Sequence, residues 1–148
     1  MFTEISLAAM IVAVCLLLHV SGVLAMAELL LRHRENLEKR GTRIHDAVLL
    51  ILLFAGIMFL HITETCIWAT FYYTQELFKD FETSVYFSLT SYTTIGYGDV
   101  LLPERWRLVG AIEGVSGVLL CGVSTAFIFA VISAMFQMRL QQHRSPTA

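Results

Sequence analysis

The residues whose types and spacing could do chemistry form one run, 93–99, with the sequence TTIGYGD. Lipid offers no hydrogen-bonding partners, so irregular backbone at membrane depth must be buried in protein or line a water-filled path. Left-handed backbone costs little at glycine and more at residues with a Cβ. Glycines at alternate positions therefore let successive carbonyls face one axis, as strand geometry does not. Such carbonyls can replace the water shell of a dehydrated cation.

The run therefore predicts a ladder of cation-binding oxygens. A cation without substitute oxygens would lose tens of kcal/mol of hydration free energy. We expect the Thr94 hydroxyl to add the innermost oxygen layer. The side chains of Ile95 and Tyr97 should point away from the axis and, by packing, fix the diameter of the ring of carbonyl oxygens around it. The predicted ion-binding residues are Thr94, Ile95, Gly96, Tyr97 and Gly98.

The elements that must position this run are apolar. The chain has 148 residues, of which 57% are hydrophobic, and a mean hydropathy of +0.70. Three segments, 5–31, 47–73 and 108–138, each exceed the roughly 20 residues that a spanning helix needs. A net charge of -2 gives no nucleic-acid footprint. Composition thus predicts an integral membrane protein.

A short amphipathic stretch, 83–92, directly precedes the glycine-rich run. It is too short to cross a bilayer as a helix, and Thr83 or Ser84 could cap its start. Pro103 prevents a helix from continuing through Leu102. A short helix followed by a glycine-rich return predicts a re-entrant loop. The partial negative charge at the helix's C-terminal end would favour a cation in a central cavity.

Basic residues predict the topology. The linker 32–46 holds half of the chain's Lys and Arg, and Gly41 and Thr42 provide a break within it. A short loop this basic should stay cytoplasmic, and it could also attract anionic lipid. Arg139 and Arg144 follow the last segment, so we expect the N-terminus outside and the C-terminus inside. A cleaved signal peptide is disfavoured because residues 1–6 carry no Lys or Arg.

Several ionisable residues lie inside the apolar segments. His19, Ser21 and Glu28 interrupt the first segment, which indicates that one of its faces meets protein. His61 and Glu64 share one face of the second segment. We expect hydrogen bonds that fix their packing, in preference to a proton sensor. The cysteines are predicted to be small buried hydrophobes without disulfide or metal spacing; they are Cys15, Cys66 and Cys121. No Ser/His/Asp or metal constellation indicates an enzyme.

The run TTIGYGD resembles the selectivity signature of potassium channels, with Ile95 at the variable position. The stretch 47–138 looks like the pore domain of bacterial two-transmembrane-type potassium channels: outer helix, pore helix, filter and inner helix. The resemblance implies K+ as the permeant ion at Thr94, Ile95, Gly96 and Tyr97, with no cofactor. It also implies a homotetramer, in which three identical subunits join each chain, in a bacterial plasma membrane.

The resulting fold class is an all-α membrane protein with three transmembrane helices, a re-entrant pore helix with its filter loop, and a tetrameric pore. Its expected parts are an N-terminal helix with basic linker (1–43), the pore domain (44–138) and a short cytoplasmic tail (139–148). The first helix lies outside the pattern that the resemblance covers.

The resemblance also assigns supporting residues. It implies that Tyr97 packs against pore-helix aromatics at the positions of Tyr86 and Phe87. Thr90 stands where some members carry a Glu behind the filter, so a carboxyl pair with Asp99 is absent. Glu113 could partly replace that Glu if its helix face turns toward the pore helix.

The last apolar segment carries the gate candidates. Gly117 matches a glycine at which the family's inner helix bends, and Gly122 follows; hinge and close packing remain alternatives. The residues expected to face the pore are Thr125, Phe129 and Ser133. Phe129 is either a hydrophobic constriction or packed against the outer helix.

Three other functions compete with a potassium channel. A weakly selective cation channel is disfavoured because Tyr97 stands intact between two glycines. A non-conducting accessory subunit is disfavoured because the run is undegraded. An ion-coupled transporter usually shows repeats and paired broken helices, whereas one re-entrant loop is expected here.

Overall fold

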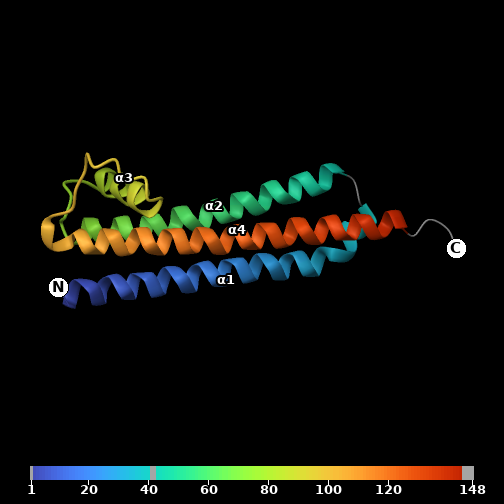
Figure 1. Cartoon of the computed structure of the whole chain (residues 1–148), viewed down its shortest axis with the longest axis horizontal. Helices are drawn as coiled ribbons and strands as arrows, with labels where there is room; N and C mark the ends of the chain where they lie inside the picture. The colour runs from blue at the N-terminus through green and yellow to red at the C-terminus, as the bar shows by residue number, and fades with distance from the viewer. Residues whose placement is uncertain (1, 41–42, 145–148) are drawn as a thin grey trace.

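Three long helices run side by side, and a short fourth helix lies against them at one end (Figure 1). The computed structural model describes residues 2–40 and 43–144, with side chains for all of these except 33–40, 43 and 142–144. The elements are α1 (Phe2–Arg40), α2 (Arg43–Thr74), α3 (Phe81–Tyr92), the 3-10 turn η1 (Glu104–Trp106) and α4 (Arg107–Arg144). The described residues contain no strand, which confirms the all-α class.

The three long helices are apolar enough to cross a membrane. Within the described residues the candidate spans are Phe2–Arg32, Ile44–Thr74 and Glu104–Gln141, with mean hydropathies of 2.5, 2.2 and 2.3. They contain the three segments predicted from composition, so the three-span prediction is confirmed.

The basic linker is more helical than its polarity suggested. α1 continues to Arg40 and α2 begins at Arg43, because the residues from 35 to 40, ENLEKR, include strong helix formers. The break predicted at Gly41 and Thr42 lies outside the described residues. So do residues 145–148 of the predicted tail and the basic side chains of Arg34, Lys39, Arg40, Arg43 and Arg144.

The short helix α3 begins earlier than predicted, and a different residue caps it. Asp80, rather than Thr83 or Ser84, is the N-cap: its carboxylate accepts a hydrogen bond from the Thr83 backbone N–H at 2.7 Å. Aspartate one residue before Phe81 was an available signal, because Asp is among the strongest N-cap residues. This bond also lowers the pKa of the Asp80 carboxyl.

An aromatic cluster holds α3 against the C-terminal end of α2. Tyr72 meets Phe87 edge-on with ring centroids 5.2 Å apart, and Phe78 lies 5.0 Å from Phe87. Trp68 stacks on the other side of Tyr72 at 6.1 Å. Trp106 packs edge-on against Phe71. Since aromatic pairs add stabilisation beyond their buried area, α3 has a rigid support.

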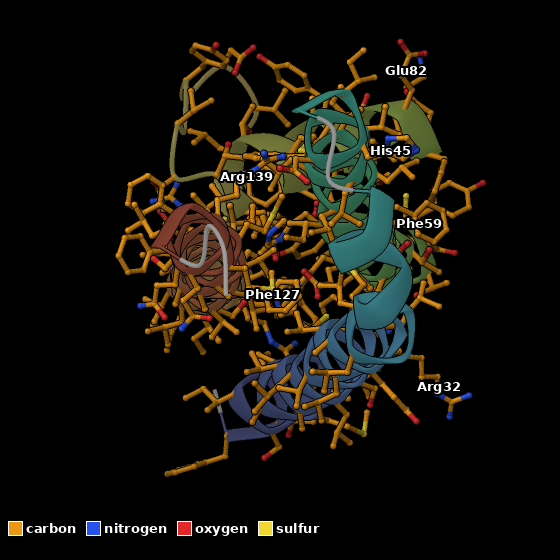
Figure 2. The ribbon with its side chains drawn as sticks, turned by 90° about the vertical axis from the view of Figure 1, so that its right-hand side faces the viewer. Arg32, His45, Phe59, Glu82, Phe127 and Arg139 are labelled. Carbon is orange, nitrogen blue, oxygen red and sulfur yellow. The ribbon has the colours of Figure 1, made fainter. Side chains whose placement is uncertain are left out.

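Ion pairs join the helices at both ends of the bundle. Glu4 of α1 pairs with Arg105 of η1. At the opposite end, Asp46 of α2 accepts from Nε of Arg139 of α4 at 2.7 Å. Figure 2 views the bundle end-on: side chains fill the space between the helices, with Phe127 turned toward it and Arg32 turned away.

Candidate ion-conduction site

The run 93–99 follows α3 directly, and every second residue in it is left-handed. The φ angles are +59° at Thr94, +51° at Gly96 and +79° at Gly98. The alternation at the two glycines is what the sequence predicted. Thr94 was not foreseen, because a positive φ is a strained conformation for a β-branched residue.

Backbone hydrogen bonds turn the start of this run back onto α3. The N–H of Thr94 donates to the Ser91 carbonyl at 2.9 Å, and the N–H of Gly96 donates to the Thr90 carbonyl at 3.0 Å. These bonds satisfy carbonyls that the end of a helix would otherwise leave without a partner. They explain why the loop starts where it does and why Thr94 keeps its strained conformation. The Thr94 hydroxyl donates to the Thr93 carbonyl at 2.7 Å.

The side chains of the run project out of the single chain. Ile95 is 56% exposed and Tyr97 is 69% exposed. Large apolar side chains this exposed beside strained backbone indicate that further protein surrounds the run.

The residues predicted to support the filter have different partners in the structure. Phe87 packs in the aromatic cluster with Tyr72, whereas the hydroxyl of Tyr86 donates to a carboxylate oxygen of Asp99 at 2.7 Å. This bond holds the pKa of the Asp99 carboxyl below its usual range. The Thr90 hydroxyl donates to the Phe87 carbonyl, within α3.

The glycines of α4 differ in their surroundings. A Cβ at Gly117 would lie 2.2 Å from the carbonyl oxygen of Tyr92, whereas a Cβ at Gly122 would meet nothing within 4 Å. Gly114 likewise approaches the Ser91 carbonyl. Close packing is therefore a property of Gly117, where α4 touches the end of α3.

The other gate candidates lie further along α4. Thr125 is exposed and bonds within its helix to the Cys121 carbonyl, and Ser133 is half-buried. Phe129 is 70% exposed. Most of its side chain therefore has no contact within the single chain.

An open groove of about 580 Å³ lies between the run, α3 and α4. Its wall on α4 carries exposed aliphatic side chains, among them Val115, Val118 and Leu119. Gly96 and Gly98 line the same groove. The apolar surface of α4 therefore continues into the glycine run.

Glu113 turns toward α3, the orientation that its sequence position left open. It is fully buried and accepts a hydrogen bond from the Tyr72 hydroxyl at 2.7 Å. Ser88 contacts its other oxygen and also lies 3.0 Å from the Thr65 carbonyl. Ser88 therefore links Glu113 of α4 to the middle of α3, and Thr65 of α2 to the same point.

A second buried cluster contains residues that the site prediction missed. Glu64 bonds to His19 of α1 and Tyr92 of α3, and Ser124 of α4 contacts both His19 and His61. The predicted hydrogen bonding of His61 and Glu64 is confirmed. The sequence signal that could have placed His19 in this cluster is the presence of a histidine inside an apolar segment. Ligand atoms of His19, His61 and Glu64 lie within 4.8 Å of one another, but each also meets a hydrogen-bonding side chain of the cluster.

The cysteines carry no cross-link within the described residues. Cys15 is buried, Cys66 is half-buried and Cys121 is exposed, and all three are free thiols. The prediction of small hydrophobic residues holds for Cys15, whereas Cys121 faces outward from the single chain.

Three membrane-spanning helices with a short helix and an irregular loop at one end define a class of membrane proteins that form pores. A family model described as "Ion channel" matches residues 47–134, more than half of the chain. The chain therefore belongs to this ion channel family, whose members work as oligomeric assemblies in a lipid bilayer. Comparisons with curated proteins and with solved structures found no match.

Proposed function

We propose that the chain is a subunit of a potassium-selective channel that conducts K+ passively through the filter residues 94–98. The observation that carries this proposal is the left-handed backbone at Thr94, Gly96 and Gly98, directly after the end of α3. Alternating handedness is the local geometry that a ladder of carbonyl ligands requires. The proposed K+ ligands are the carbonyls of Thr94, Ile95, Gly96 and Tyr97, with the Thr94 hydroxyl as the inner layer.

The charges around the run favour a cation. α3 ends at Tyr92, so the partial negative charge of its last carbonyls lies beside the start of the run. The ionised Asp99 follows the last glycine. Acidic groups at a pore mouth raise the local concentration of cations.

A homotetramer would complete the walls of the pore. One chain offers only one side of an ion path, and its Ile95 and Tyr97 side chains are exposed. Three further copies around a four-fold axis would cover these side chains and the groove beside α4, since closed cyclic symmetry is the usual solution for such assemblies.

The proposed orientation places the N-terminus and the filter mouth outside, with the C-terminus in the cytoplasm of a bacterial cell. The N-terminus and α3 lie at one end of the bundle and the C-terminus at the other (Figure 1). The basic residues of 32–46 favour the cytoplasm for the second end, where they could also bind anionic lipid.

The direct test is ion flux in liposomes that contain the purified full-length chain. We expect K+ to pass far faster than Na+ when each is driven by the same concentration gradient. Equal rates for the two ions would leave a weakly selective cation channel. Absence of flux for both would favour an accessory subunit.

Gly96→Ala should abolish K+ flux without preventing assembly. The position has open space for a Cβ but a φ of +51°, so the change adds roughly 1–2 kcal/mol of local strain and no clash. Gly56→Ala is the matched control, because its Cβ would meet only the flexible tip of Met26. Unchanged K+ flux in Gly96→Ala would show that ions follow another path.

A further inference from the structure

Four buried side chains and the half-buried His61, drawn from all four α-helices, close a ring of hydrogen-bonding contacts at the centre of the bundle. Glu64 Oε1 lies 2.8 Å from His19 Nδ1, and His19 Nε2 lies 3.0 Å from Ser124 Oγ. Ser124 Oγ lies 3.0 Å from His61 Nε2, and His61 Nδ1 lies 2.9 Å from the Tyr92 hydroxyl. That hydroxyl reaches the second oxygen of Glu64 and closes the ring.

The ring needs one more proton than its residues supply in their usual forms. Five contacts require five protons, one for each. Two neutral imidazoles, one serine and one tyrosine supply four, and an ionised carboxylate supplies none. Without a fifth proton, two lone pairs face each other at one of the contacts. The diagonal contact from His61 Nδ1 to Glu64, at 3.2 Å, uses the same N–H and changes nothing in this count.

The fifth proton also neutralises the ring. With it, Glu64 is balanced by one imidazolium, or is itself a neutral acid beside two neutral imidazoles. Without it, a net charge of -1 remains where His19 and Glu64 have no solvent exposure, which is costly at membrane depth. The sequence has no Lys or Arg within 5–31, 44–73 or 108–138. No Lys or Arg side chain of these segments can therefore balance the charge of Glu64, whereas a proton from bulk water can.

The other titratable groups around the ring do not replace that proton. Cys15 of α1 and Cys121 of α4 lie close enough to Glu64 to interact with its charge, and a thiol provides no positive charge. The contacts of Glu113 of α4, to Tyr72 and Ser88, form a separate cluster. The ring is thus electrically self-contained.

Tyr92 connects the ring to the run 93–99. It is the last residue of α3 and only 2% exposed. Its carbonyl is packed against Gly117 of α4, and the Thr93 N–H that follows it donates to Leu89. A change in the hydroxyl contact of Tyr92 therefore acts on the residue that holds the start of the run in place.

We infer that the ring of His19, His61, Glu64, Tyr92 and Ser124 is an intramembrane proton-binding site whose single exchangeable proton keeps the run 93–99 in its conducting arrangement. The proton comes from and returns to bulk water, and no covalent bond changes. The inference rests on the proposed function in one respect: the effect on the run is read as K+ flux. It gives the first helix, through His19, a direct part in the behaviour of the pore.

Glu64→Gln tests the inference because a glutamine mimics the protonated ring. Its amide N–H can donate to His19 Nδ1 while its carbonyl accepts from Tyr92, so all five contacts are complete without an added proton. In liposomes with a chelator present, we expect wild-type K+ flux to fall by up to about tenfold per pH unit above its midpoint, between about pH 5 and about pH 9. Flux through Glu64→Gln should remain high across that range.

Three controls define the alternatives. Glu28→Gln makes the same change at an exposed ion pair of α1 and should keep the wild-type fall. Glu113→Gln should keep it too, because Glu113 belongs to the other cluster. Tyr92→Phe leaves His61 able to contact Glu64 directly, so the proton should still bind but no longer act on flux. A flat wild-type profile, a Glu64→Gln profile that falls like the wild type, or a response that disappears with chelator would overturn the inference.

Thermal unfolding in detergent provides a readout that does not depend on conduction. The melting temperature of the wild type and of Tyr92→Phe should fall as pH rises, whereas that of Glu64→Gln should not. Absence of K+ flux at every pH, together with this stability pattern, would reject the proposed function and retain the proton site. A pH-independent melting temperature of the wild type would reject the proton site even if the protein conducts K+.

Discussion

At the scale of single residues, two buried carboxyl groups take different parts in supporting α3. Glu113 meets the hydroxyls of Tyr72 and Ser88. Glu64 meets two imidazoles, which can share its proton. The chemistry of each carboxyl is thus set by its partners, since both have no solvent exposure.

The exposed Asp99 should make K+ flux fall in acid, whereas the ring around Glu64 should make K+ flux fall as pH rises. The Tyr86 hydroxyl holds the pKa of Asp99 below the ordinary value of about 3.9. Stabilisation from this bond is therefore fully present above that value and is lost as pH falls through the lower, folded pKa. Tyr86→Phe should return the pKa toward the ordinary range, so that acid reduces K+ flux at a higher pH than in the wild type.

This prediction is checked by flux at external pH from about 6 down to about 3. Tyr73→Phe is the matched control, since Tyr73 lies at the end of α2 and packs against Phe81. If acid reduces K+ flux at the same pH in Tyr86→Phe as in the wild type, Asp99 does not control cation entry.

At the scale of elements, α3 is a short helix held from three directions. The aromatic cluster holds its middle, Glu113 contacts it at Ser88, and the hydrogen-bonded ring around Glu64 holds its end at Tyr92. α4 approaches the same end so closely at Gly117 that no side chain fits there. Helix propensity alone would not maintain a helix of this length, so tertiary contacts determine both its position and its last residue.

Gly117→Ala should destabilise the protein by about 1–3 kcal/mol, because the new methyl group would overlap the Tyr92 carbonyl and force backbone shifts. Gly122→Ala, one turn further into open space, should be neutral or stabilising by up to about 1 kcal/mol. The melting temperatures of both variants in detergent test this difference. Equal effects at the two glycines would contradict the close contact.

At the scale of the whole molecule, one chain is an incomplete pore. Its most exposed apolar side chains include those of the glycine run and of α4 beside the groove. α1 lies against α2 and α4, outside residues 47–134 that match the family model. The groove side therefore remains for subunit contact, and α1 adds a helix to the opposite part of the bundle.

Val118→Trp should prevent assembly, because Val118 is half exposed on the groove wall and a larger ring would fill the space that a neighbouring subunit needs. Phe59→Trp is the control, since Phe59 points outward from α2, away from α4 (Figure 2). Native mass spectrometry should give a tetramer for the wild type and the control, and smaller species for Val118→Trp. A tetramer of Val118→Trp would place the subunit contact elsewhere.

The sequence by itself determined the three spans, the short helix and the alternation at Gly96 and Gly98. These follow from local causes: long apolar runs, a stretch too short to span, and the conformational freedom of glycine. It also indicated that His19, His61 and Glu64 face protein, since ionisable groups at membrane depth seek partners.

Only the tertiary structure decided which partners those groups have. His19 and Ser124 are separated by 105 residues along the chain and meet at 3.0 Å, a pairing that no local pattern encodes. The same holds for Gly117 against Tyr92, and for the left-handed Thr94, whose strained backbone persists because α3 holds the loop by hydrogen bonds. Periodicity and composition report what each helix must bury. Which side chains meet depends on how the helices pack. That packing brings the hydrogen-bonded ring around Glu64 and the glycine run to the two sides of one residue, Tyr92.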